Sequence, residues 1–410
     1  MSGTIKRGIE KSIKILLEKF PCVALFGARQ VGKSTLLHKV LPKARFFDLE
    51  YSPDLDQITD QTQLDLIFKE TKQSLVFDEA QLCPKLFSSL RVEIDRDRKN
   101  NGKFLLSGSS SHTLIKAITE SLAGRVAMLE IPTLCWNEAL GKKQSNFYQN
   151  LKSPESFKKL KPLFTREELL ELCYFGLYPE PFLERKDSLK YKLWQENYFK
   201  SYIDRDVRAL FPQLNLDAYR RFIRMLGVSS GDLFKASNFS NSLDVSQPTI
   251  KNYLEIAEGT FLWRKLNCYS KNTKKRLVKM PKGYIKDPIL TNYLLNINSV
   301  SDLKSHPSFG NIWESFIIEQ IIKNLEMHFI RANYYFYRTH HQAEIDFVIE
   351  GDFGLIPIEI KSGSFTKSEQ LITLKNFIKE HKCPYGLVIN MGEEVKQLTE
   401  SIYQVPASFL

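Results

Sequence analysis

The chain has 410 residues, more than one hydrophobic core usually organises, so we expect two or three domains. Its content of 43% hydrophobic and 12% aromatic residues excludes a mostly disordered chain, and its formal net charge of +11 suggests a polyanionic partner. The sequence has no apolar run of roughly 20 residues, no signal-peptide core at its start and no CxxC pair, which predicts a cytoplasmic protein with no membrane contact and no disulfide framework or zinc site.

The first third of the sequence alternates strands with helices. Apolar residues at three- and four-residue spacing predict a helix that ends before Pro21, and a second helix is predicted at residues 33–40. Short apolar strands are predicted at residues 22–26, 45–49, 74–77, 104–106 and 126–131. Such an alternation is typical of an open parallel α/β sheet, and we assign residues 1–140 to this domain.

A phosphate-binding loop follows the first predicted strand. Residues 27–34, GARQVGKS, fit the pattern GxxxxGK[ST] between a strand and a helix, so backbone N–H groups and the helix N-terminus can bind phosphate. We expect Lys33 to reach the β- and γ-phosphates of ATP, and the Ser34 hydroxyl to ligate Mg²⁺. The predicted nucleotide-binding residues are Gly27, Ala28, Arg29, Gln30, Val31, Gly32, Lys33, Ser34 and Thr35.

Two acids and a serine at neighbouring strand ends complete the predicted ATPase site. Asp78 and Glu79 end the apolar segment Leu75-Val-Phe. We expect Asp78 to hold the magnesium shell and Glu79 to orient and polarise the attacking water, because phosphoryl transfer depends mainly on positioning. Ser107, at the end of the next strand, is the candidate for contact with the γ-phosphate or the water, and Ser109 is its competitor.

Arg125 has two interpretations. It can act as an arginine finger that stabilises transition-state charge in a neighbouring subunit, which would require a homo-oligomer. Alternatively, it forms a salt bridge within its own chain. The sequence leaves both open.

The middle of the chain is predicted to be a polar linker at residues 141–165 and a mainly helical domain at residues 166–300. Residues 234–258 resemble a helix-turn-helix, with Ser246 as the N-cap of the second helix. The strand-like residues that follow would form the wing of a winged-helix-like fold.

The densest basic stretch is the segment 264–286, which holds nine cations and no acid. Residues 1–140 carry a net charge of only +3, and the remainder carries +8. The segment is either a solvated hairpin or a nucleic-acid contact, in which Tyr269 and Tyr284 could stack on bases. Its cations are Arg264, Lys265, Lys271, Lys274, Lys275, Arg276, Lys279, Lys282 and Lys286.

Residues 301–410 are predicted to form a small α/β domain with a second cluster of charges. Alternation along the strand places Glu344 and Asp346 on one face, and likewise Glu359 and Lys361 on the next strand. Acids and a lysine on adjacent strands suit metal-dependent phosphodiester cleavage, and Glu314 on the preceding helix could complete the cluster. The alternatives are nucleic-acid binding without cleavage, or a protein-interaction role in which the acids form salt bridges with Lys361 and Arg338.

Several motifs together carry a resemblance to a known family. GARQVGKSTLL, LVFDEAQ, LLSGSSS and SLAGRV, in this order, resemble the bacterial and archaeal AAA+-like ATPases whose C-terminal half is a domain of unknown function. Residues 174–179, 202–206, 282–287 and 344–346 look like signatures of that second half. The trio Asp346, Glu359 and Lys361 resembles the PD-(D/E)XK nuclease fold.

The resemblance implies ATP binding with Mg²⁺, and hydrolysis. We therefore expect an AAA+-type ATPase that couples its nucleotide state to a C-terminal module binding nucleic acid or protein. The alternatives are an ATP-gated switch with little turnover, and an ATP-regulated, metal-dependent nuclease.

Overall fold

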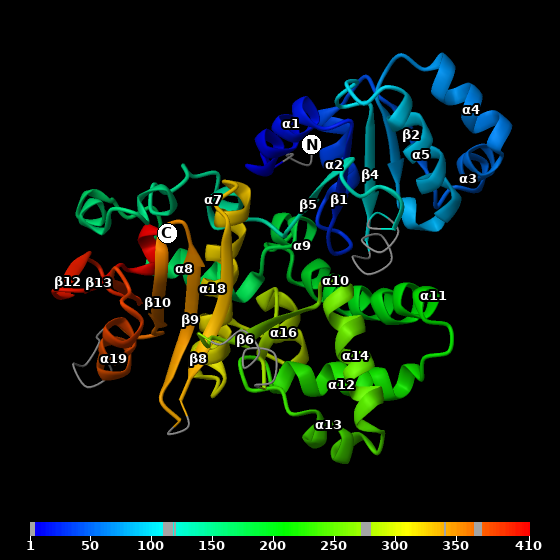
Figure 1. The fold of residues 1–410 in the computed structure, drawn as a ribbon. Helices are drawn as coiled ribbons and strands as arrows, with labels where there is room; N and C mark the ends of the chain where they lie inside the picture. The colour runs from blue at the N-terminus through cyan, green and yellow to red at the C-terminus, as the bar shows by residue number, and fades with distance from the viewer. Residues whose placement is uncertain (1–4, 110–117, 119, 272–279, 340–341, 365–370) are drawn as a thin grey trace. The chain divides into compact units, whose positions relative to one another are not determined.

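The computed structural model describes residues 5–109, 118, 120–271, 280–339, 342–364 and 371–410. These residues form two compact units (Figure 1). The first comprises the chain up to Leu134 together with Gly259–Leu262, and the second comprises Cys135–Glu258 together with Trp263–Leu410. Among the described residues, no helix is long and apolar enough to cross a membrane.

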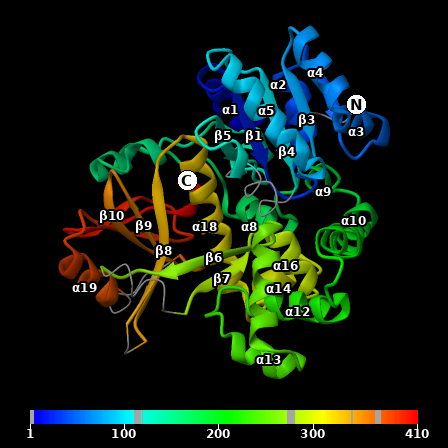
Figure 2. The same ribbon diagram turned by 45° about the vertical axis from the view of Figure 1, so that its right-hand side comes forward.

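The first unit is built on a five-stranded parallel sheet in the order β2-β3-β4-β1-β5 (Figures 1 and 2). Its strands are β1 Cys22–Phe26, β2 Arg45–Asp48, β3 Leu75–Asp78, β4 Phe104–Gly108 and β5 Val126–Glu130. All five predicted strands are thus present, and the predicted parallel α/β class is confirmed. Because β4 lies between β1 and β3, the carboxyl ends of these three strands are neighbours at one edge of the sheet.

Helix α1 Ile9–Lys19 precedes the first strand of this sheet. Helices α2 Lys33–Val40, α3 Ser52–Thr59, α4 Gln61–Glu70 and α5 Pro84–Arg96 lie between its strands in the sequence. Apolar residues of α3, α4 and α5 form one buried core with alternate residues of β1, β3 and β4, whereas α1 packs against α2 and β1. Burial of these side chains is the main favourable contribution to folding of the unit.

The second unit begins with helices. The main ones are α7 Trp136–Leu140, α8 Arg166–Phe175, α9 Pro179–Leu183, α10 Ser188–Ser201, α11 Arg208–Leu210, α12 Leu216–Val228, α13 Ala236–Leu243, α14 Gln247–Gly259, α16 Pro288–Leu294, α17 Val300–Ser305, α18 Phe309–Met327 and α19 Ile372–His381. A π-helical turn at Tyr202–Val207 joins α10 to α11. The Ser246 hydroxyl accepts a hydrogen bond from Thr249 N at 3.2 Å, as expected of the predicted N-cap of α14. A helical middle region is therefore confirmed.

The segment 141–165, expected to be a polar linker, contributes to the core of the second unit. Five of its apolar side chains are buried, at Phe147, Tyr148, Leu151, Phe157 and Phe164. The Tyr385 hydroxyl donates to Leu151 O at 2.6 Å. The apolar residues are widely spaced among polar ones, and this pattern resembles a solvated linker when only the sequence is considered.

An eight-stranded sheet in the order β12-β13-β11-β10-β9-β8-β6-β7 organises the rest of this unit. Its strands are β6 Trp263–Cys268, β7 Lys282–Ile285, β8 Ala332–Arg338, β9 Glu344–Gly351, β10 Gly354–Ile360, β11 Gly386–Ile389, β12 Lys396–Thr399 and β13 Ile402–Gln404. Strand β6 is antiparallel to β7 and parallel to β8. The two strands at the ends of the basic segment therefore belong to the same sheet as the C-terminal residues.

Candidate functional site

The loop between β1 and α2 has the backbone that a phosphate-binding loop requires. Gly32 has a φ of +89° and Gln30 a φ of +60°, in the left-handed region that favours glycine. A Cβ atom added at Gly27 would lie 2.3 Å from the carbonyl oxygen of Ile131, so only glycine fits there. The helix α2 begins directly after Gly32, and its N-terminus carries the N–H groups and partial positive charge that bind phosphate.

Lys33 lies inside this loop. Its side chain is buried, and its Nζ donates to the carbonyl oxygens of Gly27 and Ala28, each at 3.0 Å. Arg29, by contrast, forms an ion pair with Glu50 at 3.4 Å. The Lys33 ammonium thus closes over the loop backbone, and it must exchange these two carbonyl partners for phosphate oxygens if a nucleotide binds.

Asp78 connects the loop to the neighbouring strand. The Ser34 hydroxyl donates to its Oδ2 at 2.5 Å, and the Ser107 hydroxyl donates to its Oδ1. A serine hydroxyl beside a carboxylate offers the oxygen ligands that Mg²⁺ prefers, so these residues fit that ion. Ser107, predicted to contact the γ-phosphate or water, is engaged with Asp78 in this structure.

Glu79 is held by Ser109, which directly follows β4. Its carboxylate accepts hydrogen bonds from Ser109 N at 3.0 Å, from the Ser109 hydroxyl at 2.8 Å and from the Gln81 amide. Its backbone φ of +53° lies in the left-handed region, which is uncommon for a non-glycine residue and occurs often at functional sites. Ser107 therefore binds Asp78, and Ser109 binds Glu79. The contact of Gln81 with Glu79 was not predicted from the sequence, although Gln81 lies in the same DEAQ segment.

Arg125 lies directly before β5, whereas the phosphate loop follows the carboxyl end of β1. Because the two strands are parallel, with Cys22 opposite Val126, Arg125 lies at the edge of the sheet remote from the loop of its own chain. Its Nε and Nη2 bind the two carboxylate oxygens of Asp95 at 2.9 and 2.8 Å. These bonds, with that of Arg98, lower the pKa of Asp95 to about 2. Arg125 thus forms a salt bridge within its own chain, which is one of the two alternatives that the sequence allowed.

The basic segment 264–286 differs from the expected exposed tongue. Tyr269 and Tyr284 are both buried, so they cannot stack on bases, and that part of the prediction is wrong. The Arg264 guanidinium pairs with the buried Glu319, to which Tyr284 also donates at 3.2 Å. Four of the cations, Lys274, Lys275, Arg276 and Lys279, lie outside the described residues. The partner of Arg264 and Tyr284 lies on α18, far along the chain, and Tyr269 packs against Tyr335 of β8 and Phe377 of α19, so the spacing of residues within the segment does not predict their burial.

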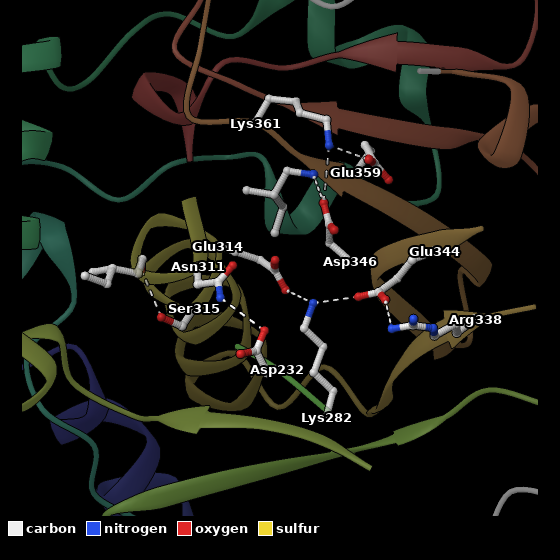
Figure 3. Close-up of polar contacts among 12 residues, drawn as sticks. Asp232, Lys282, Asn311, Glu314, Ser315, Arg338, Glu344, Asp346, Glu359 and Lys361 are labelled. Carbon is white, nitrogen blue, oxygen red and sulfur yellow. Dashed lines mark hydrogen bonds and ion pairs between the residues drawn. The ribbon is translucent and has the colours of Figure 1, made fainter. Parts of the chain in front are cut away.

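The predicted C-terminal trio does come together (Figure 3). Lys361 Nζ lies 2.5 Å from Glu359 Oε1 and 4.0 Å from Asp346 Oδ2. The backbone N of Ile360 donates to the same Asp346 oxygen at 2.7 Å. Burial, together with the nearby Asp346, raises the pKa of Glu359 to about 7, and Lys361 opposes this shift.

Glu314 has a partner that the sequence did not predict. Lys282 Nζ lies 2.7 Å from Glu314 Oε1 and 2.8 Å from Glu344 Oε1, and Arg338 binds the other oxygen of Glu344 at 3.1 Å (Figure 3). Burial alone would lower the pKa of the Lys282 ammonium, but the surrounding carboxylates raise it above its ordinary value. Glu314 therefore pairs with a lysine, and it also lies near enough to Asp346 and Glu344 for their charges to affect it. Within the described ranges, no group of three or more His, Cys, Asp or Glu side chains is placed to hold a metal ion.

Comparisons with known proteins divide the chain into three matched segments. Residues 19–140 match the family model described as an AAA domain. Residues 166–301 and 309–410 each match a domain of unknown function, DUF8612 and DUF4143 respectively. Residues 19–140 of the first unit are thus similar to an AAA domain, and the nuclease-like fold of the C-terminal residues stays a prediction.

Two relatives resemble nearly the whole chain. The uncharacterized protein Rv2008c of Mycobacterium tuberculosis is 28% identical over 405 residues, which cover 98% of this chain and 83% of that protein. The uncharacterized protein MJ1544 of Methanocaldococcus jannaschii is 26% identical over 391 residues, 91% of this chain and 82% of that protein.

Solved structures were also compared with this chain. The Walker-type ATPase PABY2304 of Pyrococcus abyssi gives a TM-score of 0.46 at 17% identity, covering 71% of this chain and 96% of that one. The RuvB Holliday junction branch migration motor of Thermotoga maritima gives a TM-score of 0.32 at 15% identity, covering 66% of this chain and 93% of that one.

Proposed function

We propose that the protein binds and hydrolyses ATP with Mg²⁺, and that its nucleotide state controls how the residues beyond the ATPase domain bind a nucleic acid or protein partner. The observation that supports this proposal best is the arrangement at the carboxyl edge of the first sheet. Lys33, Ser34 and Asp78 converge there, and Glu79 is anchored beside them.

Each residue has a separate task in the proposed reaction. Lys33 turns from the loop carbonyls to the β- and γ-phosphates, and the backbone N–H groups of the loop bind the β-phosphate. Ser34 and Asp78 hold Mg²⁺, which neutralises charge on the phosphate oxygens when it is bound. Glu79 orients and polarises the attacking water, while Ser109 fixes the position of its carboxylate.

Arg125 acts in this proposal only in a neighbouring subunit of a homo-oligomer, because it lies at the edge of the sheet remote from its own loop. Its bidentate pair with Asp95 must open for that role. The same pair is a sufficient account of Arg125 if the protein works as a monomer.

Steady-state hydrolysis of ATP tests the proposal. We expect the wild type to release phosphate, Glu79→Gln to bind ATP but turn over far more slowly, and Lys33→Ala to bind ATP weakly. Negligible turnover by a wild type that binds ATP normally would instead favour an ATP-gated switch. A wild type that does not bind ATP would contradict both.

A second candidate function is metal-dependent cleavage of nucleic acid. The close approach of Lys361 to Glu359 and Asp346 favours it, because a lysine beside two carboxylates can stabilise a phosphate held by a metal ion. Incubation with Mg²⁺ or Mn²⁺ and several forms of DNA and RNA tests it. Equal cleavage by the wild type and by Asp346→Ala would identify a contaminating nuclease and remove the candidate.

A further inference from the structure

The carboxylates of Glu314 and Glu344 face each other across a single ammonium group (Figure 3). Glu314 lies on helix α18 and Glu344 at the start of strand β9. Lys282, the first residue of β7, extends its side chain between them and contacts one oxygen of each, at 2.7 and 2.8 Å. Only 6% of that lysine side chain is exposed to solvent, so its charge is compensated by these acids and not by water.

This arrangement has the chemistry of a cation site. Two carboxylates from different elements, partly removed from water, commonly bind Mg²⁺ or a similar ion, with water completing the shell. Any such ion would be held by oxygens of the two carboxylates. The Lys282 ammonium already lies between the two carboxylates. A metal ion at the same position would be strongly repelled by the ammonium, because little water is present to screen the two positive charges.

We propose that Glu314 and Glu344 form a cation site whose occupant is the Lys282 ammonium, and that a divalent metal ion binds there only when this ammonium is removed. The backbone holds the lysine in place. Lys282 pairs with Leu266 in the β6–β7 hairpin and forms a bridge with Leu233, so its side chain cannot leave unless β7 moves or the side chain changes rotamer.

The proposal also bears on the neighbouring acids. Asp346 lies close enough to Lys282 and Glu314 to interact electrostatically with both, and Lys361 compensates it from the other side. Two lysines therefore provide the positive charge that a metal ion would otherwise supply to this group of acids. Cleavage of a phosphodiester with a metal ion at Glu314 requires Lys282 to withdraw. The proposal itself does not depend on ATP hydrolysis.

Manganese binding to the full-length, nucleotide-free protein tests the proposal, with free Mn²⁺ measured by its EPR signal. We expect Lys282→Met to bind one more Mn²⁺ per chain than the wild type, and Lys282→Met with Glu314→Gln to return to the wild-type count. Every variant keeps Ser34 and Asp78, so any Mn²⁺ bound at the nucleotide site is common to all. Equal Mn²⁺ counts for the wild type and Lys282→Met would overturn the proposal, as would loss of one Mn²⁺ from the wild type on Glu314→Gln alone.

Thermal unfolding provides a second measurement if Lys282→Met is too unstable to titrate. We expect Mn²⁺ to raise the unfolding temperature of Lys282→Gln, which fills similar space without charge, and to leave that of the wild type unchanged. The Lys282→Met, Glu314→Gln chain should be more stable than Lys282→Met alone, because it removes both members of the pair. A Lys282→Gln chain that Mn²⁺ does not stabilise would contradict the proposal.

Discussion

The two serines near the end of β4 should have separable effects on ATP turnover. The Ser109 hydroxyl donates to Glu79 at 2.8 Å, whereas the Ser107 hydroxyl donates to Asp78. In the proposed mechanism Glu79 orients the attacking water and Asp78 belongs to the magnesium shell. Ser109→Ala should therefore lower the rate of the chemical step, and Ser107→Ala should weaken binding of Mg·ATP.

The size of the Ser109 effect follows from the hydrogen bonds that remain. A hydrogen bond to a charged group contributes about 1.5–3 kcal/mol. Ser109→Ala removes one such bond, while the backbone N of the same residue, at 3.0 Å, and the Gln81 amide still hold the carboxylate of Glu79. We therefore take the lower end of that range, which corresponds to a fall in kcat of about tenfold.

The assay measures phosphate release at saturating Mg·ATP and, separately, the dissociation constant of a fluorescent ATP analogue. Ser109→Ala should lower kcat and keep the dissociation constant of the wild type. Ser107→Ala is the matched control, because it removes an equivalent hydroxyl group two residues earlier in the chain. It should raise the dissociation constant of the ATP analogue. An unchanged kcat in Ser109→Ala, or the same change of both quantities in the two variants, would refute this division of roles.

Three further predictions concern other residues. Gly27→Ala should abolish ATP binding in a nucleotide titration, because the added Cβ would lie 2.3 Å from a backbone oxygen. If Arg125 acts in a neighbouring subunit, mixing inactive Arg125→Ala with inactive Lys33→Ala should restore turnover, and no recovery in demonstrably mixed oligomers would exclude that role. Burial raises the pKa of Glu319, but Arg264, Lys286 and Lys323 together lower it below its ordinary value of 4.5, so the charged form of Glu319 stabilises the fold above that pH and less as the pH falls below it. Glu319→Gln should therefore lower the free energy of unfolding by about 3 kcal/mol at pH 7, and the gap to the wild type should narrow in urea titrations only as the pH falls below 4.5.

The arrangement of the loop and the two acids at the carboxyl edge of the first sheet was predictable from the sequence because its determinants are local. The loop residues 27–34 are contiguous, and the requirement for glycine arises from their own backbone and from one nearby strand end. Asp78 and Glu79 end an apolar strand, which places acids at the edge of a parallel sheet wherever such a strand occurs. The separate partners of Ser107 and Ser109 depend instead on the position of β4 between β1 and β3. This strand order cannot be predicted from any single segment of the sequence.

The second site was predictable only in part, for the same reason. Alternation along β9 and β10 is a local property, and it correctly brought Asp346, Glu359 and Lys361 together. Lys282 lies 62 positions before Glu344, in a stretch where surface exposure is the ordinary expectation for a lysine. Its burial depends on the parallel pairing of β6 with β8, a long-range contact that the spacing of apolar residues does not reveal.

The same pairing changes what the basic segment means. Arg264 on β6 and Lys282 on β7 both turn toward helix α18, where they pair with Glu319 and Glu314. Two cations of the densest basic stretch thus compensate buried acids and are not available to an external polyanion. Lys265, which lies between them in the sequence, is exposed. A run of lysine and arginine indicates a binding surface for a polyanion only after the partner of each cation is known. The charge excess beyond residue 140 therefore supports a nucleic-acid partner less strongly than its density along the chain suggests.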